Sequence, residues 1–153
     1  MTVQRRERVM RRFTVGVLAY LVPTFALGFV WHLILFKNYY EALAIYRGDV
    51  IIPFGLLSML IQGVIFAWIY VNAVEPRNGS FRSRALVHGA IGAVLSWSFT
   101  TIAVAAKNLM SSVPDYLLIE TAFTVVQWTM VAPLTVLAFM RPADEPGHIR
   151  LAG

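Results

Sequence analysis

Two histidines and one glutamate lie within otherwise apolar segments of the sequence: His32, His88 and Glu120. An ionisable side chain inside a hydrocarbon core costs about 2.5–3.5 kcal/mol at the centre, so it needs a partner, a neutral protonation state or a functional role. Histidine titrates near neutral pH and can hold or pass on a proton beside a carboxylate. These residue types could therefore support proton-linked binding, or ligation of a metal or haem.

Four long apolar runs position these groups. They cover about residues 13–36, 50–74, 85–106 and 116–140. Each run can cross a hydrocarbon core of ~30 Å as a helix that rises ~1.5 Å per residue, and a backbone without water must satisfy its own hydrogen bonds. The connections are short, which makes successive helices antiparallel neighbours. The sequence therefore predicts an all-α, up-down-up-down, four-helix membrane bundle.

Composition supports a membrane protein. The chain of 153 residues is 58% hydrophobic and 14% charged, whereas soluble domains carry roughly 25% charged residues. Cysteine is absent, which excludes disulfides, thiolate chemistry and cysteine metal sites. The net charge of +5 is concentrated before the first apolar run, so we expect no binding to nucleic acid. Five basic residues there could bind lipid headgroups: Arg5, Arg6, Arg8, Arg11 and Arg12.

Basic residues near the span ends predict the orientation. Ten fall in the N-terminal segment, the second connection and the C-terminal tail, against three on the opposite side, Lys37, Arg47 and Lys107. This asymmetry predicts that both termini are cytoplasmic. It divides the chain into a basic cytoplasmic N-terminus (1–12), a transmembrane domain (13–140) and a polar cytoplasmic tail (141–153).

The two histidines lie at different depths. His32 is about four residues inside the outer end of its span, and His88 is about three residues inside the inner end. At ~1.5 Å per residue they are roughly 25 Å apart, so they cannot share a haem or metal within one chain. No catalytic triad, phosphate-binding loop or pair of carboxylates is evident either. We therefore expect no metal, no cofactor and no enzymatic activity.

Glu120 lies at the same depth as His32, and His32 and Lys107 are its expected partners. Polar residues of the outer half could form a pocket for a small polar or amphipathic molecule, open to the periplasm and coupled to protonation of His32 and Glu120. The candidate ligand-binding residues are His32, Glu120, Gln127, Thr124, Gln62, Thr101 and Lys107, with Ser58 and Thr100 beside them. The expected mouth comprises Lys37, Tyr39, Tyr40, Glu41, Arg47 and Asp49. The alternative is that these side chains only hydrogen-bond between helices, at around 0.6 kcal/mol each on average.

Aromatic residues near the span ends predict belts at the two membrane surfaces. The outer belt would comprise Trp31, Tyr39, Tyr40, Tyr46 and Tyr116, and the inner belt Trp68 and Tyr70.

Three segments, FALGFVWHLILFKNYYEALAIYR, IIPFGLLSMLIQGVIFAWIY and LLIETAFTVVQW, resemble those of small uncharacterised bacterial inner-membrane proteins with four predicted spans. The resemblance covers about residues 15–140. It implies the four-helix fold and a bacterial inner membrane, and it supplies no activity.

Two hypotheses for the function follow. The first is a non-catalytic accessory or structural subunit, whose apolar helix faces pack in the bilayer on another integral membrane protein or on a second copy. The second is a binder or transporter of a small molecule or lipid that uses the pocket around His32 and Glu120.

Overall fold

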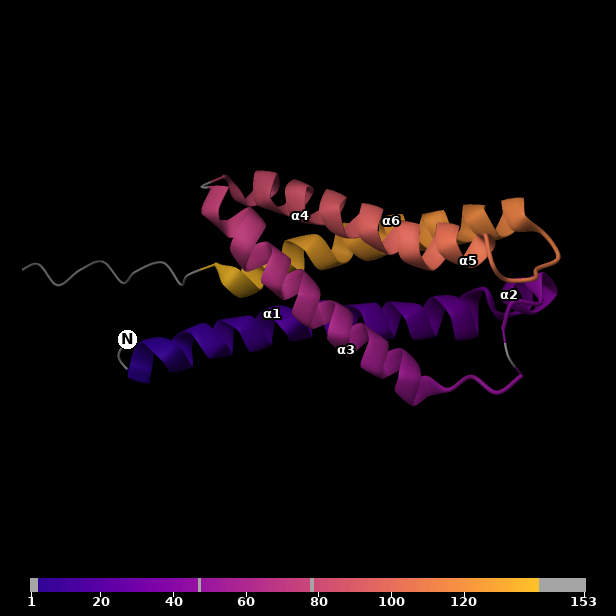
Figure 1. The fold of residues 1–153 in the computed structure, drawn as a ribbon, viewed down its shortest axis with the longest axis horizontal. Helices are drawn as coiled ribbons and strands as arrows, with labels where there is room; N and C mark the ends of the chain where they lie inside the picture. The colour runs from indigo at the N-terminus through magenta and orange to yellow at the C-terminus, as the bar shows by residue number, and fades with distance from the viewer. Residues whose placement is uncertain (1–2, 47, 78, 141–153) are drawn as a thin grey trace, which may run out of the picture.

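The computed structural model describes residues 3–46, 48–77 and 79–140. All the regular structure in these ranges is helical. In chain order the elements are α1 (Val3–Val30), η1 (Trp31–Leu35), α2 (Lys37–Leu43), α3 (Ile52–Ile69), η2 (Tyr70–Val74), η3 (Glu75–Arg77), α4 (Phe81–Ser96), η4 (Trp97–Ile102), α5 (Ala103–Ala105) and α6 (Val113–Phe139) (Figure 1). The elements η1, η2 and η4 are π-helical turns that continue the preceding α-helix.

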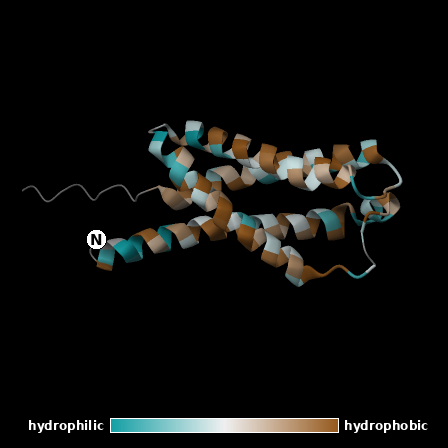
Figure 2. Cartoon of the chain, viewed as in Figure 1, coloured by the Kyte–Doolittle hydropathy of each residue, from teal (hydrophilic) through white to brown (hydrophobic). Residues whose placement is uncertain are grey.

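Four helices are long and apolar enough to cross a membrane. They comprise Arg6–Leu35, Ile52–Arg77, Phe81–Ala105 and Val113–Phe139. This confirms the predicted all-helical architecture with four candidate spans. Apolar residues cover much of the helix surfaces, and hydrophilic residues gather where α1 and α4 begin, at the same end of the molecule (Figure 2). The predicted tail, 141–153, lies outside the described residues.

The helix ends follow from local chemistry. The side chain of Ser80 accepts a hydrogen bond from the backbone N–H of Ser83 and caps α4. Ser112 caps α6 in the same way through the N–H of Asp115, and Pro114 occupies the first turn of that helix. Serine side chains satisfy N–H groups that have no partner within a helix, and proline is tolerated in the first turn.

The short helix α2 lies in the first connection and was not predicted. It exposes Lys37 and Glu41 and buries Tyr40 and Leu43, which are spaced one turn apart. The buried pair packs against Tyr116 and Ile119 of α6. The helix ends at Ala44, whose φ of 57° is left-handed. The apolar contacts with α6 therefore hold this helix together with two hydrogen bonds, which Ser111 donates to the carbonyls of Ala42 and Leu43. The helix is too short to show a clear period in the sequence.

The helix α6 is central and packs against α1 and α4. The helix α3 packs against α1, crosses it obliquely and diverges from α4 and α6 toward its Ile52 end (Figure 1). At its other end, η2 contacts α4.

Three of the tyrosines predicted for the aromatic belts are instead buried: Tyr40 at 0%, Tyr70 at 0% and Tyr116 at 3% exposure. The hydroxyl of Tyr116 donates to the carbonyl of Thr100 over 2.8 Å, and the ring of Tyr70 stacks on Phe139. The belt assignment is wrong for these three residues because neighbouring helices cover their side chains.

Candidate ligand-binding site

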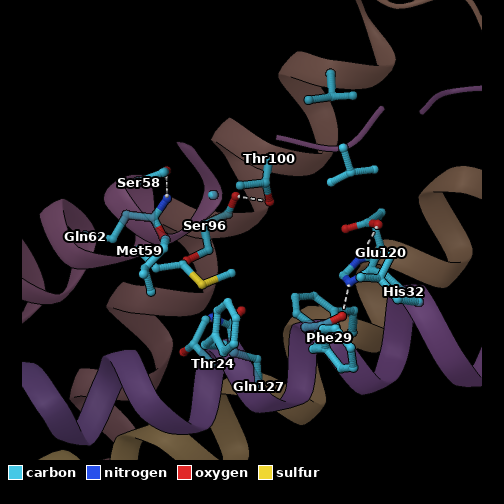
Figure 3. A pocket seen from close by; sticks show the side chains of 18 of the residues that line it. Thr24, Phe29, His32, Ser58, Met59, Gln62, Ser96, Thr100, Glu120 and Gln127 are labelled. Atoms are coloured by element: carbon cyan, nitrogen blue, oxygen red, sulfur yellow. Dashed lines mark hydrogen bonds and ion pairs between the residues drawn. The ribbon is translucent and has the colours of Figure 1, made fainter. Parts of the chain in front are cut away.

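A pocket of about 510 Å³ occupies the space between α3 and the other helices (Figure 3). Its walls come from α1 and η1, the segment after α2, α3, the α4–η4 helix and α6. Small-molecule sites usually have volumes of about 300–1,000 Å³ and mostly apolar walls with a few polar groups. This pocket fits that description, since its apolar walls enclose one cluster of ionisable side chains.

The cluster comprises His32 and Glu120, which line the pocket, and Tyr40, which contacts Glu120 but does not itself line the pocket. The hydroxyl of Tyr40 donates to Oε1 of Glu120 over 2.7 Å, and Nε2 of His32 lies 3.3 Å from the same oxygen. Nδ1 of His32 lies 2.9 Å from the carbonyl oxygen of Gly28. Glu120 is only 7% exposed. The predicted partnership of Glu120 with His32 is therefore present, and Tyr40 is an additional partner.

These contacts define where protons reside. The carbonyl of Gly28 can only accept a hydrogen bond, so Nδ1 of His32 carries a hydrogen. Nε2 of His32 can then donate to Oε1 of Glu120 only as an imidazolium facing a carboxylate. Otherwise Nε2 accepts from a protonated Glu120. In either arrangement the pair shares one proton and is neutral overall.

Two of the π-helical segments, η1 and η4, border the pocket. His32 lies in η1, and Thr100 lies in η4. A π-turn inserts a residue into a helix and re-aims the side chains beyond it, and such turns are frequent at functional sites. Nothing in the residue pattern predicts these turns.

A second polar group, away from Glu120 in the same pocket, links three helices. The hydroxyl of Tyr20 donates to Oε1 of Gln62 over 2.6 Å, and Nε2 of Gln62 donates to the hydroxyl of Ser58 over 3.2 Å. Nε2 of Gln127 donates to the hydroxyl of Thr24 over 3.2 Å. Gln62 and Gln127 therefore hydrogen-bond between helices and also line the pocket, so both roles considered from the sequence coincide here.

The other predicted site residues do not line the pocket. The hydroxyl of Thr124 donates to the backbone carbonyl of Glu120 over 2.9 Å. Thr101 is fully buried, and no described residue partners its hydroxyl. Lys107 is exposed in the connection before α6.

The entrance also differs from the expected mouth. Lys37 pairs with Glu41, with 3.6 Å between Nζ and Oε1, and neither lines the pocket. Arg47 lies outside the described residues. Near the first and third connections the pocket is lined instead by Ile45, Tyr46, Val50 and Asn108.

One signal in the sequence could have located the α1 wall. Tyr20, Thr24, Gly28 and His32 follow one another at intervals of four, which places them on one face of a helix. All four line the pocket. Tyr40 had a weaker signal, its spacing of three from Leu43.

His88 lies outside the pocket. It is fully buried between the rings of Tyr70 and Trp128. Neither of its ring nitrogens has a hydrogen-bond partner among the described residues. The same part of the chain contains no group of three His, Asp or Glu side chains arranged to hold a metal ion.

The N-terminal arginines divide into two groups. Arg6, Arg8 and Arg11 are exposed, as lipid-headgroup binding requires. Arg12 instead faces the protein, where Nη2 pairs with Oε1 of Glu75 over 2.8 Å and also donates to the carbonyl of Phe139. The side chain of Arg5 is not among those that the structure describes.

The fold and the site together define the class: an all-helical protein with four candidate membrane spans and a pocket that opens between them. A comparison with known protein families, curated proteins and solved structures found no match. The resemblance to small bacterial inner-membrane proteins therefore stays a prediction.

Proposed function

We propose that this protein binds an amphipathic small molecule, which enters the pocket from the bilayer between α3 and the α4–α6 pair. The observation that carries the proposal is the pocket itself, a space of about 510 Å³ with a buried, hydrogen-bonded carboxylate in its wall. A group that served only to join helices would not require this space beside it. Of the two hypotheses from the sequence, this geometry favours the binder or transporter.

The walls suit an amphipathic occupant. Phe25 and Phe29 of α1 and Leu33 of η1 line the pocket together with Leu56 and Met59 of α3. These side chains can contact the apolar part of a ligand, while its polar group reaches His32 and Glu120. The proposal includes no catalytic step.

The proposed setting is a bacterial inner membrane, with an up-down-up-down topology and both termini in the cytoplasm. The excess of basic residues in the N-terminal segment and the second connection supports this orientation, as does the position of the α1 and α4 starts at one end of the molecule (Figure 2). The pocket would then lie in the periplasmic half. A reporter enzyme that works only outside the cytoplasm should be inactive when it is fused to the C-terminus. Activity of this fusion would contradict the topology.

An accessory role remains the second candidate function. One face of α3 exposes a stripe of large apolar side chains: Phe54, Leu57, Ile61, Ile65 and Trp68. Their spacing of three and four residues is suitable for packing against another transmembrane helix. Stoichiometric recovery of a second membrane protein in mild detergent, or of a dimer of this chain, would support this role.

Native mass spectrometry of the detergent-purified protein tests the binding function. Gly55 lines the pocket, and a Cβ there would meet nothing within 4 Å, so a side chain can start at this position and the ring of Gly55→Phe should occupy space in the pocket. Gly48 is equally open but lies outside the pocket, which makes Gly48→Phe the matched control. We expect a co-purified small molecule to be lost from Gly55→Phe and kept by Gly48→Phe. Equal small-molecule content in the two variants would refute the proposal.

A further inference from the structure

We propose that the occupant of this pocket is a lipophilic organic cation, and that its binding releases the proton shared by His32 and Glu120. This inference rests on the proposed binding function and specifies the ligand class. It is carried by the charges around Glu120, the shared proton and the aromatic walls.

The groups that face Glu120 contain one ionisable base. They are His32 from η1, Tyr40 from α2, Tyr46 from the segment after α2 and Tyr116 from α6 itself. The facing walls of α3 and η4 contribute hydroxyl and amide groups, Ser58, Gln62 and Thr100. No lysine or arginine in the described ranges forms an ion pair with Glu120. Among the described residues, its counter-charge is therefore the proton that it shares with His32.

Loss of that proton changes the charge of the site. A neutral His32 beside an ionised Glu120 carries one uncompensated negative charge in a mostly apolar pocket. A buried charge without a partner is strongly unfavourable. A ligand with one positive charge restores neutrality, whereas a neutral ligand leaves the charge uncompensated and an anion doubles it.

The exchange balances. The bond that breaks is the N–H bond at Nε2 of His32 or the O–H bond of the Glu120 carboxyl, whichever carries the shared proton, and this proton leaves to water. One cation enters, and no other covalent bond changes. Oε2 of Glu120 can face the cation. The contacts from His32 and Tyr40 both end on Oε1, and no described residue donates to Oε2.

Aromatic rings surround this end of the pocket. Phe123 lies with its ring centroid 4.7 Å from that of His32, and the centroid of Tyr46 lies 6.2 Å from it. Phe29 lines the same pocket. Aromatic faces attract cations, and cages of such rings recognise quaternary ammonium groups. An inorganic ion such as Ca²⁺ requires six to eight oxygen ligands, several of them usually carboxylates, and the described residues contain no group of three His, Asp or Glu side chains that could hold a metal ion.

Two probes of the same shape and opposite charge test the inference: tetraphenylphosphonium and tetraphenylborate. Both are titrated against the full chain in lipid nanodiscs. Because both probes also enter the bilayer itself, binding to the pocket is taken as the difference between the wild type and Gly55→Phe. We expect pocket-dependent binding of the phosphonium alone, with release of up to one proton per ligand in weakly buffered solution. Where binding releases one full proton, linkage requires the dissociation constant to fall by about tenfold for each rise of one pH unit.

Glu120→Gln should abolish proton release and remove the preference for the cation. Glu41→Gln is the matched control, because Glu41 is an exposed carboxylate outside the pocket. The comparison of the two probes in the wild-type protein needs no variant of Glu120, so it decides the question even if Glu120→Gln fails to fold.

The outcomes separate this inference from the proposed function. Equal binding of the two probes, or cation binding without proton release, would overturn the inference. If Gly55→Phe loses a neutral co-purified molecule and the phosphonium never binds, the binding function stands and the inference fails. If Gly55→Phe affects neither the co-purified content nor any probe, both fail.

Discussion

Tyr40 donates a hydrogen bond to Glu120 over 2.7 Å, although 80 residues separate them in the sequence. The contact joins α2, which lies between two spans, to the carboxylate in the wall of the pocket. The hydroxyl of Tyr40 and the imidazole of His32 meet the same oxygen, and the ring centroids of these two residues lie 4.7 Å apart. The short helix α2 therefore forms part of the site.

Replacement of Tyr40 by Phe should destabilise the protein. The variant keeps the ring and removes the donor, so the buried Oε1 of Glu120 retains only His32. Loss of one partner of a buried, charge-assisted hydrogen bond costs about 1–3 kcal/mol. Thermal unfolding in detergent should show a lower Tm for Tyr40→Phe. The adjacent Tyr39, which is 38% exposed, supplies the control, and an equal effect of Tyr39→Phe would contradict the role assigned to Tyr40.

Tyr40 should also make the protein sensitive to alkali. Burial and the neighbouring charge of Glu120 raise the pKa of the Tyr40 phenol above its usual value of 10.0. Above about pH 10 the unfolded state loses this proton while the folded state keeps it, so rising pH favours unfolding. Between about pH 9 and pH 11 the wild type should lose stability more steeply than Tyr40→Phe. Parallel stability curves for the two proteins would refute this.

Gly92→Ala should weaken the packing of α4 on α6. A Cβ at Gly92 would overlap the six-membered ring of Trp128, which is buried and held by a hydrogen bond from Nε1 to the hydroxyl of Ser96. Overpacking of a filled core typically costs about 1–3 kcal/mol. The reduced Tm should recover in part in a double variant with Trp128→Phe. Gly55→Ala, where the space is open, should leave stability unchanged or raise it.

Arg12→Ala should destabilise the protein by about 1 kcal/mol, because this side chain joins three elements. It pairs with Glu75 of η3 and donates to the carbonyl of Phe139 at the end of α6, where a cation is favourable. Arg8 is the matched control, since its contact is with Gln4 on its own helix. Added salt should reduce the difference between Arg12→Ala and Arg8→Ala. Equal Tm values for the two variants would show that the contact of Arg12 contributes nothing.

The sequence by itself determined the helical architecture and the number of candidate spans. Apolar runs long enough to cross a bilayer must become helices, because no other open structure satisfies their backbone groups without water. Counting residues from the ends of the spans also placed His32 and Glu120 at one depth, since helical rise is constant. These inferences use only distance along one helix.

The tertiary structure decided which side chains of each helix contact which other segments. The oblique course of α3 opened the pocket, the π-turns aimed His32 and Thr100 toward it, and α2 brought Tyr40 to Glu120. It also buried tyrosines that composition assigned to the membrane surface, and it turned Arg12 inward to the end of α6. Each of these outcomes depends on rotation about a helix axis and on contacts between distant segments. Hydropathy and spacing constrain neither, because several rotations bury similar apolar area.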